Sequence, residues 1–308
     1  MAHQLRSETL RVNGHDLHYV TAGEGPPLVF LHGVLGTYKV WAHLATEMAE
    51  SHTVIAPDLF GCGDSARPMA DYSLGGHAGA VRDVFDQLGI RDAVIVGHSL
   101  GGGIAMEFTY LFPERVEGLV LCASGGLGRE VNMLLRAPTM PGAEWVLPVL
   151  ASGFARRQGN ALRKGLRMVG VRGSTDVAEA WHGFEQLSDK DSRRAFLATI
   201  RSVVGPDGQR VSAEELLPKM KVPTLLVWGD KDWMIPMVHA QAALKHLPDA
   251  RLVVFENAGH FPHLDQPDRF AALMWEFTQE LKERRGQKVA RPRIKGDISP
   301  TPTAGSPG

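Results

Sequence analysis

Ser99 stands in a stretch whose composition suits a nucleophile. The pentad GHSLG at 97–101 lies within AVIVGHSLGGGIAM at 93–106, where an apolar run precedes the serine and an apolar helical period follows it. A turn from strand to helix holds such a serine at strained backbone angles, and side chains on its flanks would collide with the adjacent chain. The helix N-terminus behind Ser99 would also stabilise negative charge. A small polar turn residue needs none of these features, so the pattern favours a nucleophile.

His260 is the predicted base, because a serine hydroxyl attacks efficiently only when a base removes its proton. The chain has thirteen histidines, and NAGHFPHLDQP at 257–267 places His260 just after the last predicted strand, in a loop opened by Gly259. The competitor His263 already enters the next helix and would face elsewhere. We therefore predict that His260 activates Ser99.

Asp232 is the predicted partner of that histidine. The segment LLVWGDKDWMIP at 225–236 offers two carboxylates after the penultimate strand. Asp230 sits directly at the strand end, where its side chain could simply cap the turn. Asp232 lies two residues further into the loop and reaches toward the histidine loop, so we predict Asp232 as the acid.

Backbone N–H groups are predicted to stabilise the oxyanion. FLHGVLGT at 30–37 ends an early strand in a turn that can aim the N–H of Val34 toward the serine. The N–H of Leu100, directly after Ser99, would be the second donor. Both are predicted by position alone, because backbone donors do not depend on the side chain. We expect His32 itself only to brace neighbouring loops.

The elements that must position these residues alternate between strand and helix. Continuous apolar runs are typical of parallel strands that are covered on both faces. Helical periods lie between them, and the turn signal Asn13-Gly14 predicts a hairpin near the start. The sequence predicts an α/β fold with a doubly wound, mostly parallel sheet, whose ligand crevice lies at the carboxyl ends of the strands. The predicted strands are 27–33, 53–59, 93–99, 118–124, 224–230 and 251–260, and the helices are 40–50, 78–89, 101–112 and 238–248.

Segment 125–217 interrupts this alternation, because it shows helical patches and no strand signal. We predict a core formed by 1–124 and 218–287, an all-helical lid at 125–217 over the crevice, and a disordered tail at 288–308, which is rich in Pro, Gly, Ser and Thr. The apolar lid residues are Met133, Met140, Trp145, Phe154, Met168, Trp181, Phe184 and Phe196. They suggest an apolar acyl or aromatic pocket, although such residues are equally typical of ordinary core.

A basic stretch within the predicted lid has two interpretations. Residues 151–175 contain six basic side chains and no acidic one; the basic residues are Arg156, Arg157, Arg163, Lys164, Arg167 and Arg172. A solvated helix face is the favoured interpretation. The alternative is a patch that attracts anionic substrates or the surface of a lipid bilayer.

Composition limits the partners. The 308 residues are 44% hydrophobic and 22% charged with a formal net charge of -1, so no bulk charge attracts nucleic acid or membranes. No apolar run approaches the ~18 residues of a membrane span, and the start has no signal-peptide core. Cys62 and Cys122 are too few for a disulfide framework and lack metal-ligand spacing. We expect a cytoplasmic protein without cofactor or metal that acts on a small molecule.

Five motifs resemble the lid-bearing serine hydrolases of the α/β-hydrolase superfamily. They are HGVLGT at 32–37, PDLFGCGDS at 57–65, GHSLGGG at 97–103, GDKDWMIP at 229–236 and GHFPHLDQP at 259–267. The resemblance covers roughly residues 8 to 285. It implies that Ser99, Asp232 and His260, in the chain order of this superfamily, are nucleophile, acid and base. It also implies that Val34 and Leu100 form the oxyanion hole, that PDLFGCGDS is a structural loop, and that the enzyme is an esterase or lipase.

Other activities are separated by single residues. Related dehalogenases and epoxide hydrolases use aspartate where Ser99 stands, which disfavours them. Carbon–carbon bond hydrolases of ring-fission products share the triad but usually carry a proline in the oxyanion loop, which HGVLGT lacks, so this activity is the second choice. Cofactor-free perhydrolases and haloperoxidases resemble this chain in GHSLGGG, so an activity of that kind stays open as well. A non-catalytic ligand receptor on the same fold stays open, since an intact triad is necessary for hydrolysis but not sufficient.

One nucleotide-binding pattern is discounted. GCGDSA at 61–66 fits the glycine fingerprint of dinucleotide-binding proteins after a predicted strand. That fingerprint requires a helix to open at its glycines, whereas RPMADYS follows here, with Pro68 and no apolar period. We therefore expect no nucleotide cofactor.

Overall fold

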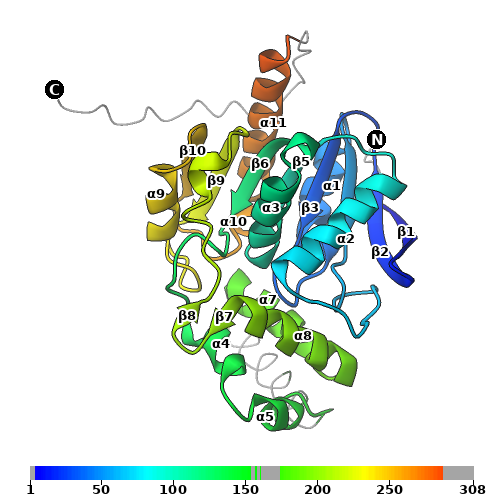
Figure 1. The fold of residues 1–308 in the computed structure, drawn as a ribbon, viewed down its shortest axis with the longest axis vertical. Coiled ribbons are helices and arrows are strands. Elements are labelled where there is room, and N and C mark those ends of the chain that lie inside the picture. Colours follow the sequence, from blue (N-terminus) through cyan, green and yellow to red (C-terminus); the bar gives the residue numbers. More distant parts are fainter. Residues whose placement is uncertain (1–3, 154–156, 158–159, 161–173, 287–308) are drawn as a thin grey trace, which may run out of the picture.

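The centre of the computed structural model is an eight-stranded sheet (Figure 1), and the structure describes residues 4–153, 157, 160 and 174–286. The spatial order is β1-β2-β4-β3-β5-β6-β9-β10, and the strands from β4 to β10 run parallel. The strands are β1 (Arg6–Val12), β2 (His15–Ala22), β3 (Pro27–Leu31), β4 (Thr53–Pro57), β5 (Ala93–His98), β6 (Val116–Cys122), β9 (Thr224–Gly229) and β10 (Ala250–Phe255). The predicted fold class is confirmed.

The first two strands form the predicted hairpin. Val12 pairs with His15 across a two-residue turn, and Asn13 and Gly14 both have positive φ, at 50° and 79°. Asparagine and glycine adopt this conformation more readily than other residues, which is why this dipeptide joins β1 to β2. The predicted last strand was too long: β10 ends at Phe255, because the chain turns at Asn257, where φ is 60°.

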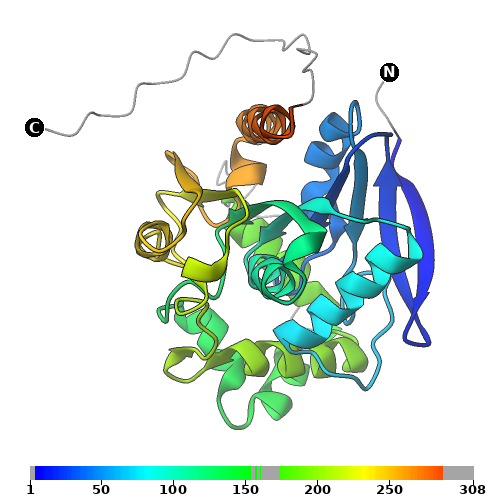
Figure 2. The ribbon, with the colours of Figure 1, turned by 45° about the horizontal axis from the view of Figure 1, so that its top comes forward.

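Both faces of the sheet are covered by helices, which explains the continuous apolar runs. In β3, Leu28 and Phe30 belong to one buried cluster and Val29 and Leu31 to the other, and all four side chains are fully buried. Burial of each such side chain contributes about 1.5–3 kcal/mol. One cluster includes α2 (Leu74–Gln87), α3 (Leu100–Leu111) and α9 (Val238–Leu244); the other includes η1 (Tyr38–Trp41), α1 (Ala42–Met48) and α11 (Pro267–Arg284). Figure 2 shows the two layers on either side of the sheet.

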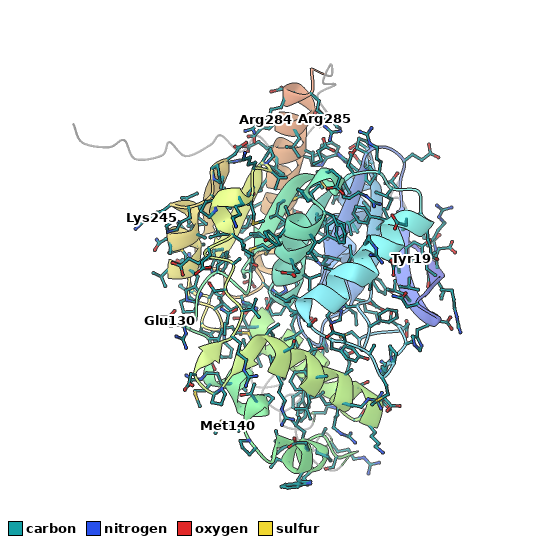
Figure 3. All side chains as sticks on the ribbon, viewed as in Figure 1. Tyr19, Glu130, Met140, Lys245, Arg284 and Arg285 are labelled. Atoms are coloured by element: carbon teal, nitrogen blue, oxygen red, sulfur yellow. The ribbon has the colours of Figure 1, made fainter. Side chains whose placement is uncertain are left out.

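The labelled elements between β6 and β9 gather at one end of the molecule, at the bottom of Figure 1. Figure 3 places Met140 in this part and Arg284 and Arg285 at the opposite end. Its described elements are α4 (Met133–Arg136), η3 (Ala137–Thr139), α5 (Ala143–Leu150), α7 (Thr175–Gln186), α8 (Lys190–Val203), β7 (Val204–Gly205), β8 (Gly208–Gln209) and η4 (Leu217–Lys219). Two short elements elsewhere are η2 (Pro113–Arg115) and α10 (Pro262–Asp265).

The prediction that this segment is all-helical is wrong at one place. β7 and β8 form a small antiparallel hairpin, in which Gly205 pairs with Gly208. Gly208 has a φ of 120°, which a residue with a side chain rarely adopts, and so lets the chain reverse there. Of the predicted basic stretch, Arg157 is exposed, whereas Arg156, Arg163, Lys164, Arg167 and Arg172 lie outside the described residues, as does the predicted tail. Among the described helices, none combines the length and apolarity needed to cross a membrane.

Candidate active site

Ser99 occupies a strained turn between β5 and α3. Its φ of 53° and ψ of -115° are unusual for a residue with a side chain. A Cβ atom on Gly97 would lie 2.3 Å from the carbonyl oxygen of Gly101, and one on Gly101 would lie 2.2 Å from that of Leu31. Only glycine therefore fits at these two positions. Strain of this kind persists where the surrounding structure imposes it, and the Ser99 carbonyl accepts a 2.9 Å bond from the N–H of Gly125.

His260 and Asp232 form a buried pair. Nδ1 of His260 lies 2.8 Å from Oδ2 of Asp232, and the two side chains are 2% and 0% exposed. The carboxylate accepts the Nδ1–H bond, so Nε2 is left without a proton in the neutral ring. The other carboxylate oxygen accepts bonds of 2.9 Å from the N–H groups of Met234 and Ile235. Asp230, the alternative acid, is exposed at the end of β9.

His98 connects the serine turn to the His260 loop. Its Nε2–H donates a 2.9 Å bond to the His260 carbonyl, and the centroids of the two rings lie 4.8 Å apart. Burial, followed by the neighbouring His260 and His263, holds the pKa of His98 well below its usual range. His98 is therefore a neutral structural group. The sequence indicated only that a residue of any type would precede the serine.

His263 contacts Trp41 and Cys122 rather than Asp232. Its ring stacks on Trp41 with centroids 4.2 Å apart, and its Nδ1 lies 3.5 Å from Sγ of Cys122. Burial lowers the pKa of His263 to about 3, so the ring stays neutral over the physiological range. His263 thus belongs to the packed aromatic layer beneath the site.

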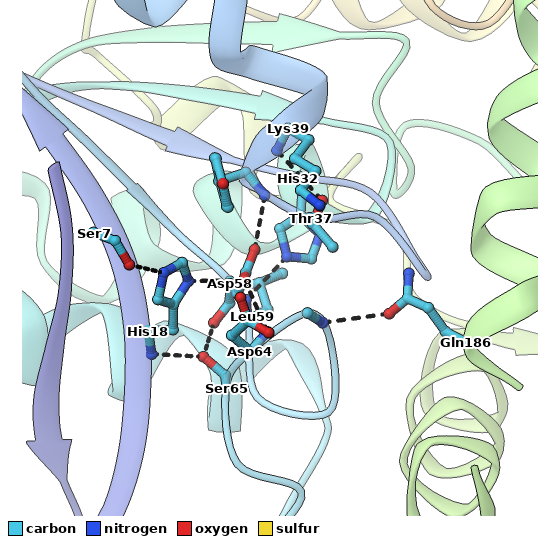
Figure 4. Close-up of polar contacts among 12 residues, drawn as sticks. Ser7, His18, His32, Thr37, Lys39, Asp58, Leu59, Asp64, Ser65 and Gln186 are labelled. Carbon is cyan, nitrogen blue, oxygen red and sulfur yellow. Dashed lines mark hydrogen bonds and ion pairs between the residues drawn. The ribbon is translucent and has the colours of Figure 1, made fainter. Parts of the chain in front are cut away.

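His32 braces two loops, as predicted. Its Nδ1–H donates a 2.8 Å bond to the Gly33 carbonyl, and its Nε2 accepts a 2.9 Å bond from the N–H of Leu59 (Figure 4). Burial lowers the pKa of His32. Both ring nitrogens are occupied by backbone groups, so this side chain fixes the loop that carries Val34.

The loop after β4 is organised by Asp58. This carboxylate accepts the N–H bonds of Tyr38 at 2.8 Å and Asp64 at 3.0 Å, and lies 2.9 Å from Nδ1 of His18 (Figure 4). His18, Asp58 and Asp64 bring potential metal ligands within 4.8 Å of one another. Because both oxygens of Asp58 and both ring nitrogens of His18 already have hydrogen-bond partners, the group fits a structural role. The described residues 61–73 open no helix, which agrees with discounting the dinucleotide fingerprint.

An apolar cavity opens at Ser99. It contains about 480 Å³ of empty space, including its mouth, and both Val34 and Leu100 line it. Its other described lining residues are Leu74, Gly103, Gly125, Gly126, Val131, Leu135, Ile200, Val203, Val204, Gln209, Val211 and Ile235. Gln209 is engaged, since it accepts from the N–H of Gly126 and donates to the Gly128 carbonyl. No charged side chain is found among the lining residues that the structure describes.

Two further cavities adjoin it. One, of about 360 Å³, shares Leu74, Gly103, Gly126 and Val211 with the first. The other, of about 290 Å³, shares Val34 and Leu100 and is also lined by Phe60 and Phe196. Ser99 lines only the first cavity, whereas Val34 and Leu100, the predicted oxyanion donors, line both the first and the third.

Asp176, in the first turn of α7, was not anticipated as part of the site. It accepts a 2.9 Å bond from the backbone N–H of His260 and a 2.7 Å bond from Nε1–H of Trp233. Burial raises its pKa, while the neighbouring His260 acts in the opposite direction. An acidic residue in a first helical turn is common, so no local pattern distinguished this one.

Comparisons with known proteins give a family and several relatives. The sequence profile of the alpha/beta hydrolase fold family matches residues 26–267. An uncharacterized protein of Mycobacterium tuberculosis (strain ATCC 25618 / H37Rv) is 35% identical over 86% of this chain and 79% of its own. A 2-hydroxymuconate semialdehyde hydrolase of Pseudomonas sp. (strain CF600) is 30% identical over 88% of this chain and 91% of that protein. The structure of Est816, described as an N-acyl homoserine lactone degrading enzyme, superposes with a TM-score of 0.68 at 28% sequence identity. The superposition covers 88% of this chain and 100% of the Est816 chain.

Proposed function

This chain belongs to the alpha/beta hydrolase family, and from that premise we propose that it is a serine hydrolase that cleaves carboxylic esters. The observation that carries the proposal is the buried pair of His260 and Asp232, together with a strained Ser99 that lines an apolar cavity. His98, next to Ser99 in the chain, bonds the His260 carbonyl. Strain at a polar side chain that faces a cavity is typical of reactive positions.

The reaction would proceed through an acyl-enzyme. Nε2 of His260 takes the proton of Ser99 while its Oγ attacks the ester carbonyl carbon, and Asp232 stabilises the imidazolium. Collapse of the tetrahedral intermediate breaks the bond to the alcohol, which leaves with the proton from His260. Water then gives its proton to His260 and attacks the acyl group. The acid leaves, the proton returns to Ser99, and the enzyme is regenerated.

The N–H groups of Val34 and Leu100 would bind the oxyanion. Leu100 is the first residue of α3, so its N–H has no acceptor within that helix. The positive end of the helix dipole lies at the same place and favours an anion. Val34 lies in the loop that His32 holds in position. Preorganised donors of this kind contribute about 2.7–4 kcal/mol each to transition-state stabilisation.

The cavity supports an ester with an apolar acyl or aromatic group. A carboxylate on the substrate would lose its hydration there without gaining a described cationic partner, which is strongly unfavourable. We propose that segment 125–217 acts as the lid over this cavity, since Val131, Leu135, Ile200 and Val204 supply much of its wall.

Cleavage of carbon–carbon bonds is the second candidate, favoured by the similarity to the 2-hydroxymuconate semialdehyde hydrolase. The substrate in that name carries a carboxylate, whereas the described wall here is uncharged. A direct comparison of a neutral 4-nitrophenyl ester with a ring-fission acid decides between the two candidates, and turnover of neither would favour a ligand receptor.

Substitution of the serine tests the proposal. Ser99→Ala is expected to lower ester turnover by roughly 10⁴ to 10⁶ and to abolish labelling by a fluorophosphonate. Ser188→Ala, at an exposed serine that lines none of the three cavities, is the matched control and should leave both unchanged. Turnover that survives in Ser99→Ala, or labelling of another residue in the wild type, would overturn the assignment.

A further inference from the structure

Helix α7 touches both loops on which the proposed reaction depends. Its first turn contacts the His260 loop through Asp176, and its last residue contacts the loop after β3 through Gln186. We propose that α7 is a brace across the site, and that Asp176 and Gln186 are positioning residues for the base and for the oxyanion donor. This inference rests on the proposed function. It identifies α7 as the element that holds the His260 loop and the loop carrying Val34 at fixed positions relative to each other.

The Asp176 end fixes the His260 backbone. Both carboxylate oxygens accept N–H bonds, one from the His260 main chain and one from the Trp233 indole, and Asp176 is 3% exposed. A Cβ on Gly259 would lie 2.5 Å from this carboxylate, so the loop is packed directly against it. Trp233 follows Asp232 in the chain. One side chain of α7 therefore ties together the loops that carry the proposed acid and base.

The Gln186 end fixes the loop that carries Val34. Its Nε2–H donates a 2.6 Å bond to the Leu35 carbonyl, and its Oε1 accepts a 3.3 Å bond from the N–H of Gly63 (Figure 4). Leu35 has a φ of 54°, a left-handed conformation that costs about 1 kcal/mol or more for a residue with a side chain. The bond from Gln186 stabilises this conformation, which sets the orientation of the neighbouring peptide at Val34.

The packing of α7 agrees with this role. A Cβ on Gly183 would lie 2.9 Å from Cβ of Leu35, so the helix approaches the oxyanion loop as closely as a glycine allows. The helix has twelve residues and is therefore about 18 Å long, enough to reach from one loop to the other. In the sheet, β5, β6 and β9 separate β3 from β10, so the two loops are not direct neighbours in the strand order.

The two contact residues of α7 differ in charge, since Asp176 is acidic and Gln186 is neutral. Their roles can therefore be tested separately by the pH profile. The titratable groups around the His260 ring are Asp232, Asp176, His98 and His263. The two histidines are held neutral by burial, so the carboxylates are the charges that stabilise a protonated His260. Gln186 is neutral and contacts only backbone groups of the other loop.

Three variants test the brace by kcat, KM and the pH profile of ester hydrolysis. Asp176→Asn should lower kcat about tenfold and move the acid limb of kcat/KM down by roughly half a unit to one unit, because one negative charge near His260 is lost. Gln186→Met, similar in size, should lower kcat about tenfold without moving that limb. His182→Gln, at the exposed partner of the ion pair with Glu179 on the same helix, is the control and should change neither.

The outcomes separate the brace from the proposed reaction. If Ser99→Ala is inactive while Asp176→Asn and Gln186→Met both keep the wild-type kcat, the brace is refuted and the reaction stands. An equal loss in both variants with an unchanged acid limb would mean general loosening and would also refute it. Thermal unfolding by circular dichroism verifies that each variant is folded, and if Asp176→Asn does not fold, Gln186→Met decides the question alone. Turnover that survives in Ser99→Ala refutes the proposed reaction instead.

Discussion

Replacement of Asp232 by asparagine is the sharpest test of the proposed mechanism, because the structure dictates how the amide must be oriented. Oδ1 of Asp232 accepts two backbone N–H bonds, from Met234 and Ile235, each 2.9 Å long. An asparagine NH₂ group placed there would face two donors, so the amide oxygen keeps that position. The NH₂ group then faces Nδ1 of His260, which the carboxylate contacts at 2.8 Å in the wild type.

This orientation forces the wrong tautomer. Nδ1 must accept the amide hydrogen, so the proton of the neutral ring moves to Nε2, which can then no longer take the proton of Ser99. The substitution also removes the charge that stabilises the imidazolium. In the serine protease triad, the same exchange lowers kcat by about 10⁴. We expect a loss of roughly 10³ to 10⁴ here, which corresponds to about 4–5.5 kcal/mol.

The assay is hydrolysis of 4-nitrophenyl butyrate between pH 6 and 9. Asp230→Asn is the matched control, since it makes the same chemical change two residues earlier at an exposed side chain. It should stay within about twofold of the wild type. Fluorophosphonate labelling of Asp232→Asn should slow in parallel with turnover. A loss of less than tenfold in Asp232→Asn, or an equal loss in Asp230→Asn, would refute the tautomer argument.

Three other predictions concern stability and specificity. Gly101→Ala should destabilise the fold by about 3 kcal/mol or more in urea unfolding, because its Cβ would lie 2.2 Å from the Leu31 carbonyl oxygen. Gly79→Ala, in a helix where the new Cβ would have no atom within 4 Å, should stabilise the fold by up to ~1 kcal/mol. Equal effects of the two substitutions would contradict the steric argument. Burial lowers the pKa of His77 from 6.5 to about 4, so the unfolded chain binds a proton first and the free energy of unfolding falls as the pH falls from 6.5 to 4. His77→Phe should remove up to ~3 kcal/mol of that pH dependence. Parallel plots of unfolding free energy against pH for the two proteins would disprove it. Leu135→Trp, in the cavity wall, should lower kcat/KM for 4-nitrophenyl octanoate at least tenfold more than kcat/KM for 4-nitrophenyl acetate. The reason is that each methylene of the acyl chain contributes about 0.8 kcal/mol on burial, and the larger side chain would fill that space. An equal loss for both esters would place the acyl chain elsewhere.

Much of the core was predictable because its signals are local. Parallel strands that are covered on both faces must be apolar at successive positions, as Val29 and Phe30 are, and this constraint leaves a continuous run in the sequence. The glycines beside Ser99 are equally readable, since their need for space comes from a turn of a few residues. The hairpin β7–β8 escaped notice because four residues are too few to show a period.

The choice between similar candidates required contacts between distant segments. The sequence by itself determined the α/β fold and the presence of a serine turn, an acidic loop and a histidine loop in one order. Only the tertiary structure brought Asp232 rather than Asp230 to His260, and packed His263 against Trp41. Asp176 is 84 residues from His260 in the chain, and Gln186 is 151 residues from Leu35. Such partners leave no periodic trace, because a side chain is selected by what packs beside it in space, and that is decided only when the whole chain has folded.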